Sequence, residues 1–169
     1  GRSKTRPALT PEEVQANADT YRQQVFRILD PEKTVVDFNS RWLGALRSVE
    51  WVKLAAQYNL AQMLERREFR QRYEAGQSIA LHEFLYPLMQ GWDSVRVEAD
   101  VELGGTDQLF NLLVGRTLQE QEKQRPQCVL TQDLINGLDG RKMSKSYGNA
   151  IGLTADAKEM TFRVMQIAD

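Results

Sequence analysis

The chain has 169 residues, of which 41% are hydrophobic, so it is long enough to fold as about one domain with a core of its own. Its 22 Lys and Arg residues nearly balance 23 Asp and Glu residues, and the net charge of -1 argues against a protein dedicated to sequence-independent nucleic-acid binding. A single cysteine, Cys128, excludes an internal disulfide framework, and the lack of a signal peptide or a bilayer-spanning apolar run predicts a cytoplasmic protein with no membrane partner.

The first part of the chain is predicted to be mainly helical. The capping box Thr10–Glu13, with proline at the first helical position, predicts a helix that runs to about Leu29. Residues 34–38 form a β-branched run that predicts a short strand. Residues 48–58 and 60–73 carry apolar side chains at helical spacing, which predicts two helices.

The second part alternates between helices and strands. Residues 81–95 have a strong helical pattern, and residues 101–103 form a strand that ends at two glycines. Residues 127–131 predict another strand, and residues 155–166 a last helix capped by Thr154. Strands separated by helices predict an α/β fold with a parallel sheet.

Three polar side chains share one face of the helix predicted over residues 81–95. Tyr86, Gln90 and Asp93 stand at positions i, i+4 and i+7. Such a row can face water, as the polar side of an amphipathic helix does, or it can line a pocket. In a pocket, Asp93 could accept a hydrogen bond from a phenol, and the other two could bind an ammonium group. His82, one turn earlier, is expected to cap or pack rather than to bind a metal.

A second polar group follows the strand at residues 101–103. Gly104-Gly105-Thr106-Asp107-Gln108 connects this strand to a helix predicted over residues 106–121, and Asn111 lies one turn later. The glycines allow a ligand to approach the backbone, and the helix N-terminus points its free amides to the same place. Asp107 could bind ribose hydroxyls, but an aspartate near a helix start is also common as a cap. No Walker pattern is present.

The third group is the glycine-flanked segment over residues 140–149, Gly-Arg-Lys-Met-Ser-Lys-Ser-Tyr-Gly-Asn. It has no apolar periodicity and carries two lysines and two serines. A loop of this kind can bring positive charge onto a polyphosphate and withdraw it again.

Together these motifs resemble a known family, the bacterial tyrosyl-tRNA synthetases of class I. The pentapeptide Lys-Met-Ser-Lys-Ser at residues 142–146 is similar to the class I signature, and the other two motifs precede it in the family's order. The resemblance runs over essentially the whole chain. It implies part of a Rossmann-like, parallel-sheet catalytic domain with a helical connective insertion at about residues 40–80. Residues 81–150 would form the second half of the nucleotide-binding fold, and residues 151–169 the start of a linker to an anticodon-binding domain.

The resemblance also implies a role for each motif. The tyrosine ammonium would be held by Tyr86 and Gln90, the phenolic hydroxyl by Asp93, and the carboxylate would lie near Gln108. The ATP site would comprise Gly105, Asp107, Lys142, Met143, Ser144, Lys145 and Ser146. Of these, Lys142 and Lys145 would be catalytic, because they neutralise the phosphates as pyrophosphate leaves.

The implied activity is that of a tyrosine-tRNA ligase. Tyrosine and ATP, with Mg2+ assisting, would give tyrosyl-adenylate, and the tyrosyl group would pass to tRNA(Tyr). The implied partners are tyrosine, ATP, tRNA(Tyr) and a second copy bound through the connective insertion; no resident metal site is expected. Alternatives are a tryptophanyl-tRNA synthetase relative, which would lack the Gly-Gly-Thr-Asp-Gln motif, and a non-catalytic dimerisation or RNA-binding module.

Two departures from the family are evident. The other class I motif, His-x-Gly-His, is absent, because His82 is the only histidine. The chain also lacks a starting methionine, the first half of the nucleotide fold and the anticodon-binding domain, so we expect a piece of a longer enzyme that is weak or inactive alone. Within the insertion, Met63 and Leu64 could pack across a two-fold axis or simply fill the core.

Overall fold

The structure is a computed structural model that describes residues 10–137, 139–141, 143 and 147–166. Contacts between residues divide the chain into two compact units. One unit is Phe38–Leu134, and the other combines Gly1–Asp37 with Ile135–Asp169. The predicted insertion at residues 40–80 and the start of the predicted nucleotide-binding half share the first unit, so the boundary between them stays a prediction.

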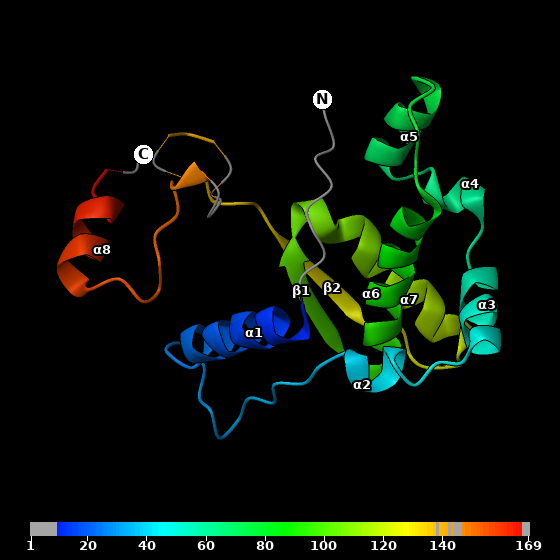
Figure 1. Cartoon of the computed structure of the whole chain (residues 1–169), viewed down its shortest axis with the longest axis horizontal. Coiled ribbons are helices and arrows are strands. Elements are labelled where there is room, and N and C mark those ends of the chain that lie inside the picture. Colours follow the sequence, from blue (N-terminus) through cyan, green and yellow to red (C-terminus); the bar gives the residue numbers. More distant parts are fainter. Residues whose placement is uncertain (1–9, 138, 142, 144–146, 167–169) are drawn as a thin grey trace. The chain divides into compact units, whose positions relative to one another are not determined.

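The unit Phe38–Leu134 begins with a series of helices and ends with two strands joined by a helical connection (Figure 1). Its elements are α2 (Ser40–Leu43), α3 (Ser48–Ala56), α4 (Leu60–Met63), α5 (Arg67–Glu74), the 3-10 helix η1 (Leu81–Phe84), α6 (Leu85–Val97), β1 (Val101–Gly105), the 3-10 helix η2 (Thr106–Gln108), α7 (Leu109–Gln121) and β2 (Cys128–Gln132).

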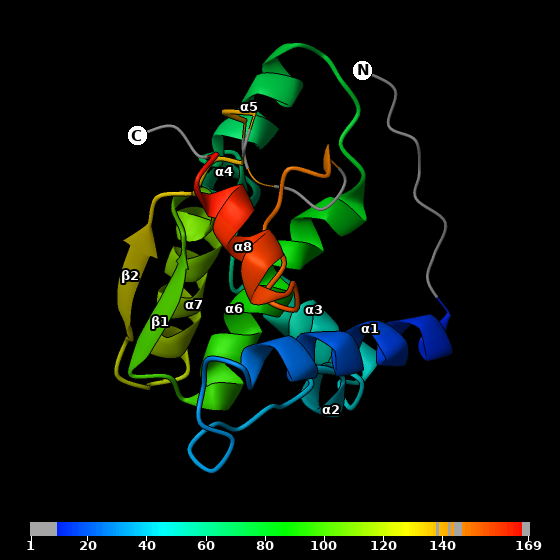
Figure 2. The same cartoon turned by 90° about the vertical axis from the view of Figure 1, so that its left-hand side faces the viewer.

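The two strands form a parallel pair in which Val101 lies opposite Cys128 and Gly105 opposite Gln132. The helix α7 connects them and lies over one face of the pair, and α6 packs on the far side of α7 (Figure 2). The predicted α/β fold with a parallel sheet is confirmed.

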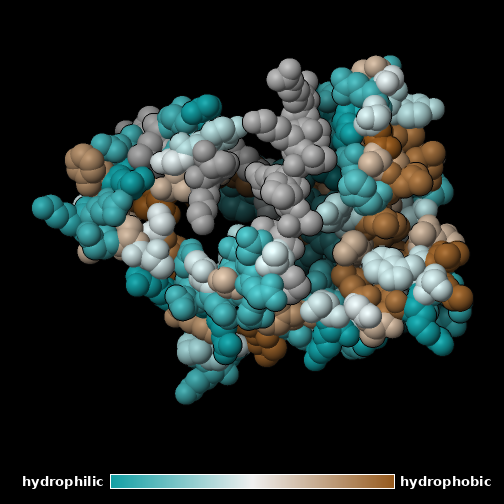
Figure 3. All heavy atoms as spheres, viewed as in Figure 1, coloured by the Kyte–Doolittle hydropathy of each residue, from teal (hydrophilic) through white to brown (hydrophobic). Residues whose placement is uncertain are grey.

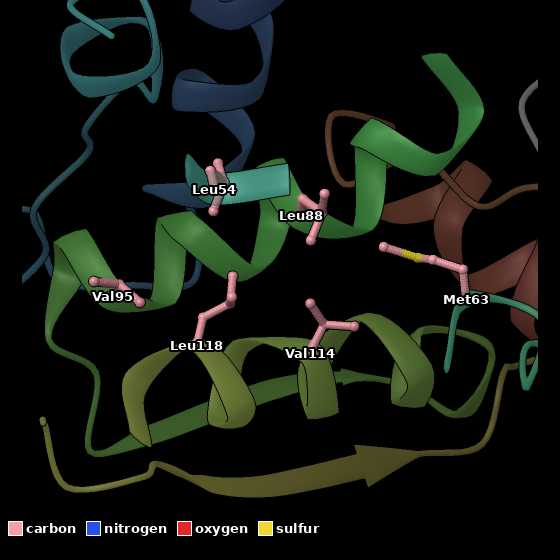
Figure 4. Packing of buried hydrophobic residues seen from close by; sticks show 6 residues of the cluster. All are labelled: Leu54, Met63, Leu88, Val95, Val114 and Leu118. Carbon is pink, nitrogen blue, oxygen red and sulfur yellow. The ribbon is translucent and has the colours of Figure 1, made fainter. Parts of the chain in front are cut away.

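The core lies between α6, α7 and the short helices α3 and α4. Figure 4 shows the side chains that meet there: Leu54, Met63, Leu88, Val95, Val114 and Leu118. Two glycines let α6 and α7 approach closely. A Cβ on Gly91 would lie 2.9 Å from the Leu118 side chain, and one on Gly115 would lie 2.5 Å from Ser94 Oγ.

One predicted helix is broken. Residues 60–73 form two helices, α4 and α5, because Arg66 adopts an extended conformation with φ -63° and ψ 118°. Met63 and Phe69 are both buried, at 3% and 2% exposure. Six positions along one helix would place them about 120° apart around its axis, and the break brings both into the interior. Met63 therefore fills the core, the second of the two alternatives, and does not pack across a two-fold axis.

Other predicted boundaries change for local reasons. The helix predicted over residues 81–95 opens with the 3-10 turn η1, because Pro87 has no N–H to donate to the carbonyl four residues earlier, and it continues to Val97. The strand predicted over residues 34–38 is wrong. This segment has no regular structure, and its Val35 is 89% exposed, with no strand paired to it among the described residues.

The second unit contains α1 (Pro11–Val25) and α8 (Ala157–Val164). The Thr10 capping box is confirmed: Glu13 N donates to Thr10 Oγ1 at 3.2 Å, and Thr10 N donates to Glu13 Oε2 at 2.8 Å. The helix ends at Val25 and continues only as turns to Leu29. The cap of α8 is Asp156, whose Oδ1 accepts from Glu159 N at 2.8 Å, so the predicted Thr154 cap is wrong.

None of the helices in the described part of the chain combines the length and the apolar character needed to cross a bilayer.

Candidate functional site

Asp93 is held by two side chains from the start of the unit Phe38–Leu134. Its Oδ1 accepts from Trp42 Nε1 at 2.7 Å, and its Oδ2 accepts from Asn39 Nδ2 at 3.2 Å. Burial raises the pKa of the Asp93 carboxyl above its usual value, and these two hydrogen bonds oppose that rise. Each carboxylate oxygen has more than one acceptor position, so Asp93 can still accept a hydrogen bond from a ligand hydroxyl.

Trp42 and Asn39 were not predicted to be parts of this site. They precede Asp93 by 51 and 54 positions, and a buried tryptophan beside a polar turn has no distinctive pattern.

Gln90 and Gln108, predicted to bind opposite ends of an amino acid, are joined by a third side chain. Asn111 Nδ2 donates to Gln90 Oε1 at 2.9 Å and to Gln108 Oε1 at 3.2 Å. Gln90 comes from the middle of α6, Gln108 from η2 and Asn111 from the first turn of α7. The structure therefore brings together these two predicted residues from different elements.

Tyr86 lies one turn before Gln90 on α6, with 63% of its side chain exposed. Its ring meets the His82 ring edge-on, with 6.5 Å between the centroids. His82 is itself exposed. No cluster of three or more His, Cys, Asp or Glu side chains suited to a metal ion occurs among the residues that the structure describes.

The glycines at the end of β1 are needed for close packing. A Cβ on Gly104 would lie 3.0 Å from the Leu112 side chain. A Cβ on Gly105 would lie 2.6 Å from Asp107 Oδ1 and 2.8 Å from Leu134 Cδ2. Asp107 itself is exposed in η2, directly after the strand. The Gly-Gly-Thr-Asp-Gln segment is thus a tight turn that leaves the aspartate at the surface.

A buried polar network fixes α6 relative to β1. Ser94 Oγ donates to Glu102 Oε2 at 2.6 Å, and Gln127 Nε2 donates to the same oxygen. Gln127 N in turn donates to Gln119 Oε1 of α7 at 2.8 Å. Because Ser94 follows Asp93 directly, the network also sets the position of Asp93 relative to the strand that carries the glycine turn.

Of the predicted loop residues, Lys142, Ser144, Lys145 and Ser146 lie outside the described residues. Between Lys142 and Ser144, Met143 N donates to Ile135 O at 3.3 Å. Asp139 links the two flanks, since its carboxylate accepts from Asn149 Nδ2 at 2.7 Å and from Arg141 Nε at 2.7 Å. These contacts lower the pKa of Asp139 to about 2.

Comparisons with known proteins agree with this architecture. The sequence model of the family described as tRNA synthetases class I (W and Y) matches residues 1–167. The chain belongs to this family of class I tRNA synthetases.

Two of the similar curated proteins are tyrosine–tRNA ligases of bacteria. The tyrosine–tRNA ligase of Nitratidesulfovibrio vulgaris is 60% identical over 170 residues, which cover 100% of this chain and 43% of that protein. The tyrosine–tRNA ligase of Syntrophotalea carbinolica is 61% identical, with 100% and 42% covered. The chain therefore spans a little over two fifths of the length of these relatives.

Solved structures show the same fold. The tyrosyl-tRNA synthetase from Archaeoglobus fulgidus, complexed with L-tyrosine, superposes with a TM-score of 0.72 at 26% identity, over 93% of this chain and 49% of that one. The tryptophanyl-tRNA synthetase from Campylobacter jejuni superposes with a TM-score of 0.66 at 19% identity, over 94% and 51%, which supports the fold alone. The predicted Rossmann-like class I architecture is confirmed.

Proposed function

We propose that this chain is the tyrosine-binding part of the catalytic domain of a tyrosine-tRNA ligase. The observation that carries the proposal is the 60% identity to a tyrosine–tRNA ligase along the whole chain. In addition, the side chains predicted to bind tyrosine all lie in the unit Phe38–Leu134, which has its own core.

In the proposed reaction the tyrosine carboxylate attacks the α-phosphate of ATP. A bond forms between a carboxylate oxygen and the α-phosphorus, the bond between this phosphorus and the pyrophosphate oxygen breaks, and tyrosyl-adenylate results. A hydroxyl of the terminal ribose of tRNA(Tyr) then takes the tyrosyl group, and AMP leaves. No step needs a side-chain nucleophile, so the protein contributes by aligning the reactants and stabilising charge on the phosphates.

Asp93 is the proposed specificity residue. A phenolic hydroxyl can donate to a remaining acceptor position of its half-buried carboxylate, whereas phenylalanine offers no donor there. A site that pairs a substrate hydroxyl rejects the analogue that lacks it, a rule for which tyrosyl enzymes are themselves the usual example. An indole N–H sits at a different place, so tryptophan is also disfavoured.

On the ATP side, Gly105 and Asp107 would contact the ribose, and Met143 and Ser146 belong to the proposed phosphate-binding segment with its two lysines. Lys142 and Lys145 would stabilise the departing pyrophosphate, so their replacement by alanine should lower turnover more than tyrosine binding. Magnesium would enter with ATP, bound mainly to the substrate phosphates.

Tyrosine-dependent ATP–pyrophosphate exchange tests the proposal. The assay compares the chain alone with a chimera in which residues 1–169 replace the matching 170-residue stretch of the Nitratidesulfovibrio vulgaris ligase. We expect exchange by the chimera with tyrosine, little with phenylalanine or tryptophan, and weak or no exchange by the chain alone. Asp93→Ala should remove the preference for tyrosine. A folded chimera that prefers tryptophan, or exchanges with no amino acid, would overturn the assignment.

We also propose that the predicted insertion forms a homodimer. Val49 and Val52 stand at i and i+3 on α3 with 63% and 69% exposure, and Leu60 at the start of α4 is 58% exposed. In Figure 3, apolar atoms gather on the side of the molecule where α3 to α5 lie. Val52→Lys should therefore shift the chimera from dimer to monomer in sedimentation equilibrium, with Lys53→Ala on the same helix as the control. A chimera that is monomeric before any substitution would refute the dimer.

A further inference from the structure

We propose that Asn111 is a positioning residue that fixes which way the amide groups of Gln90 and Gln108 point. The inference rests on the proposed function, because it concerns how the amino-acid site distinguishes the two charged ends of its substrate. Asn111 needs no contact with the substrate for this role. It acts through the two glutamines.

The geometry of the three amides supports this role. The two hydrogens of Asn111 Nδ2 diverge in the plane of the amide, so one nitrogen can serve two acceptors. Gln90 Oε1 lies 2.9 Å from that nitrogen, and Gln108 Oε1 lies 3.2 Å from it. Both donors of the Asn111 amide are therefore used, and each goes to the oxygen of a different predicted binding residue.

This arrangement matters because a glutamine amide has two ends with opposite hydrogen-bonding character. The last torsion of a glutamine side chain is broad and roughly two-fold, so an unrestrained amide can exchange its oxygen and its NH2 group by rotating half a turn. Such a rotation would put a donor where an ammonium needs an acceptor, or an acceptor where a carboxylate needs a donor. Asn111 opposes it in both glutamines, because only an oxygen can accept from its NH2 group.

Because Asn111 holds the two glutamine oxygens, the hydrogen-bonding positions that remain free on each glutamine are defined. Gln90 Oε1 keeps a second lone pair that can accept from an ammonium group. The Nε2 groups of Gln90 and Gln108 have no hydrogen-bond partner within the described part of the chain, so Gln108 can donate to a carboxylate. The two glutamines, oriented by Asn111, therefore match a ligand that carries an ammonium and a carboxylate on neighbouring atoms. Such a ligand is an α-amino acid.

The surroundings of Asn111 keep it in place. It stands in the first turn of α7, next to Leu112, which is 2% exposed and packs in the interior. Its own Oδ1 is buried and accepts no hydrogen bond among the described residues. If the Asn111 amide turned over, its NH2 group would take the buried position of Oδ1, and its oxygen would face both glutamine oxygens. The observed orientation is therefore favoured.

Kinetics of the whole-length chimera test the inference through three variants. Asn111→Ala releases both amides, and Asn111→Asp offers only acceptors, which holds the glutamines in the reversed orientation. Gln121→Ala is the matched control, because it removes from the same helix an amide that donates to Gln57 O at 2.9 Å.

For Asn111→Ala we expect the KM for tyrosine in pyrophosphate exchange to rise about tenfold, since two neutral hydrogen bonds contribute on this order. The KM for ATP should change less than about twofold, because no interaction of the nucleotide is altered. Asn111→Asp should raise the tyrosine KM further than Asn111→Ala, and Gln121→Ala should leave both constants unchanged.

A double substitution checks that the effect passes through the glutamines. Once Gln90 and Gln108 are both replaced by alanine, adding Asn111→Ala should cause no further loss of tyrosine binding. Equal changes in the KM for tyrosine and for ATP, Asn111→Asp behaving like Asn111→Ala, or full additivity in the combined variant would each overturn the inference and leave Asn111 a packing residue.

A second measurement does not depend on catalysis. In side-chain amide NMR of the chimera with 15N-labelled glutamine, Asn111→Ala should shift the signals of Gln90 and Gln108 and leave that of Gln121 in place. Unmoved signals would overturn the positioning role even in an active enzyme. Shifted signals in a chimera that does not use tyrosine would support the positioning role and refute the proposed function instead.

Discussion

Trp42→Phe isolates the hydrogen bond that holds Asp93, because it removes the indole N–H and keeps an aromatic ring in the interior. The Trp42 side chain is 8% exposed, and its Nε1 lies 2.7 Å from Asp93 Oδ1. A hydrogen bond to a charged group contributes about 1.5–3 kcal/mol, and we expect the lower end because Asp93 is only half-buried. Since about 1.4 kcal/mol corresponds to tenfold, the KM for tyrosine should rise about tenfold.

The pH dependence gives a second, independent readout. Burial raises the pKa of Asp93, and the Trp42 hydrogen bond counteracts it, so Trp42→Phe should raise this pKa further. The proposed site needs the ionised carboxylate. The acid limb of kcat/KM for tyrosine, measured in the chimera, should therefore move to higher pH in the variant.

The control for both readouts is Trp51→Phe. Trp51 packs against the core cluster around Leu54 and, unlike Trp42, is not one of the described side chains that donate a hydrogen bond to Asp93. The control should lose some stability and keep the tyrosine KM and the pH profile. If Trp42→Phe also lowers only the thermal midpoint, the Trp42–Asp93 bond has no part in tyrosine recognition and the reasoning is refuted.

Two further substitutions test the scaffold. Gly115→Ala should lower the unfolding free energy by about 1–3 kcal/mol in urea titrations, because its Cβ would lie 2.5 Å from Ser94 Oγ; an unchanged midpoint would refute the close packing of α6 on α7. Arg72 and the Ala80 N–H lower the pKa of Glu83 from 4.5 to about 2, so this carboxylate should stabilise the fold above pH 4.5 and lose that effect as the pH falls towards about 2. The stability difference between the unaltered chain and Glu83→Gln should shrink over that range, and a pH-independent difference would contradict the assignment.

The correct predictions rest on sequence patterns whose residues lie close together in the chain. The Thr10 capping box works through side chains three residues apart, so the sequence alone contains the whole interaction. The spacing of Tyr86, Gln90 and Asp93 follows from helix geometry in the same way. The glycine turn between β1 and η2 also appears where predicted, because it depends on adjacent residues.

The missed features depend on contacts between distant residues. Asp93 meets Trp42 across 51 positions, and Ser94, Glu102 and Gln127 form a buried network although each is a residue type usually found at the surface. The break at Arg66 is a tertiary effect too, since the sequence of residues 60–73 suits one helix and only the burial of both Met63 and Phe69 favours two. The β-branched run at residues 34–38 has the propensity of a strand, but a strand also needs a partner.

The division of the chain into two units implies that binding and turnover can be altered separately. The residues of the proposed tyrosine contacts belong to the unit Phe38–Leu134, as do Trp42 and Asn111, which hold them through hydrogen bonds. The segment that carries the lysines belongs to the other unit. Asp139 holds that segment's flanks through Arg141 and Asn149. Substitutions at Trp42 or Asn111 should therefore act on the tyrosine KM, whereas Asp139→Ala should act on kcat. An Asp139→Ala variant that raised the tyrosine KM as much as Trp42→Phe does would contradict this separation of binding from turnover.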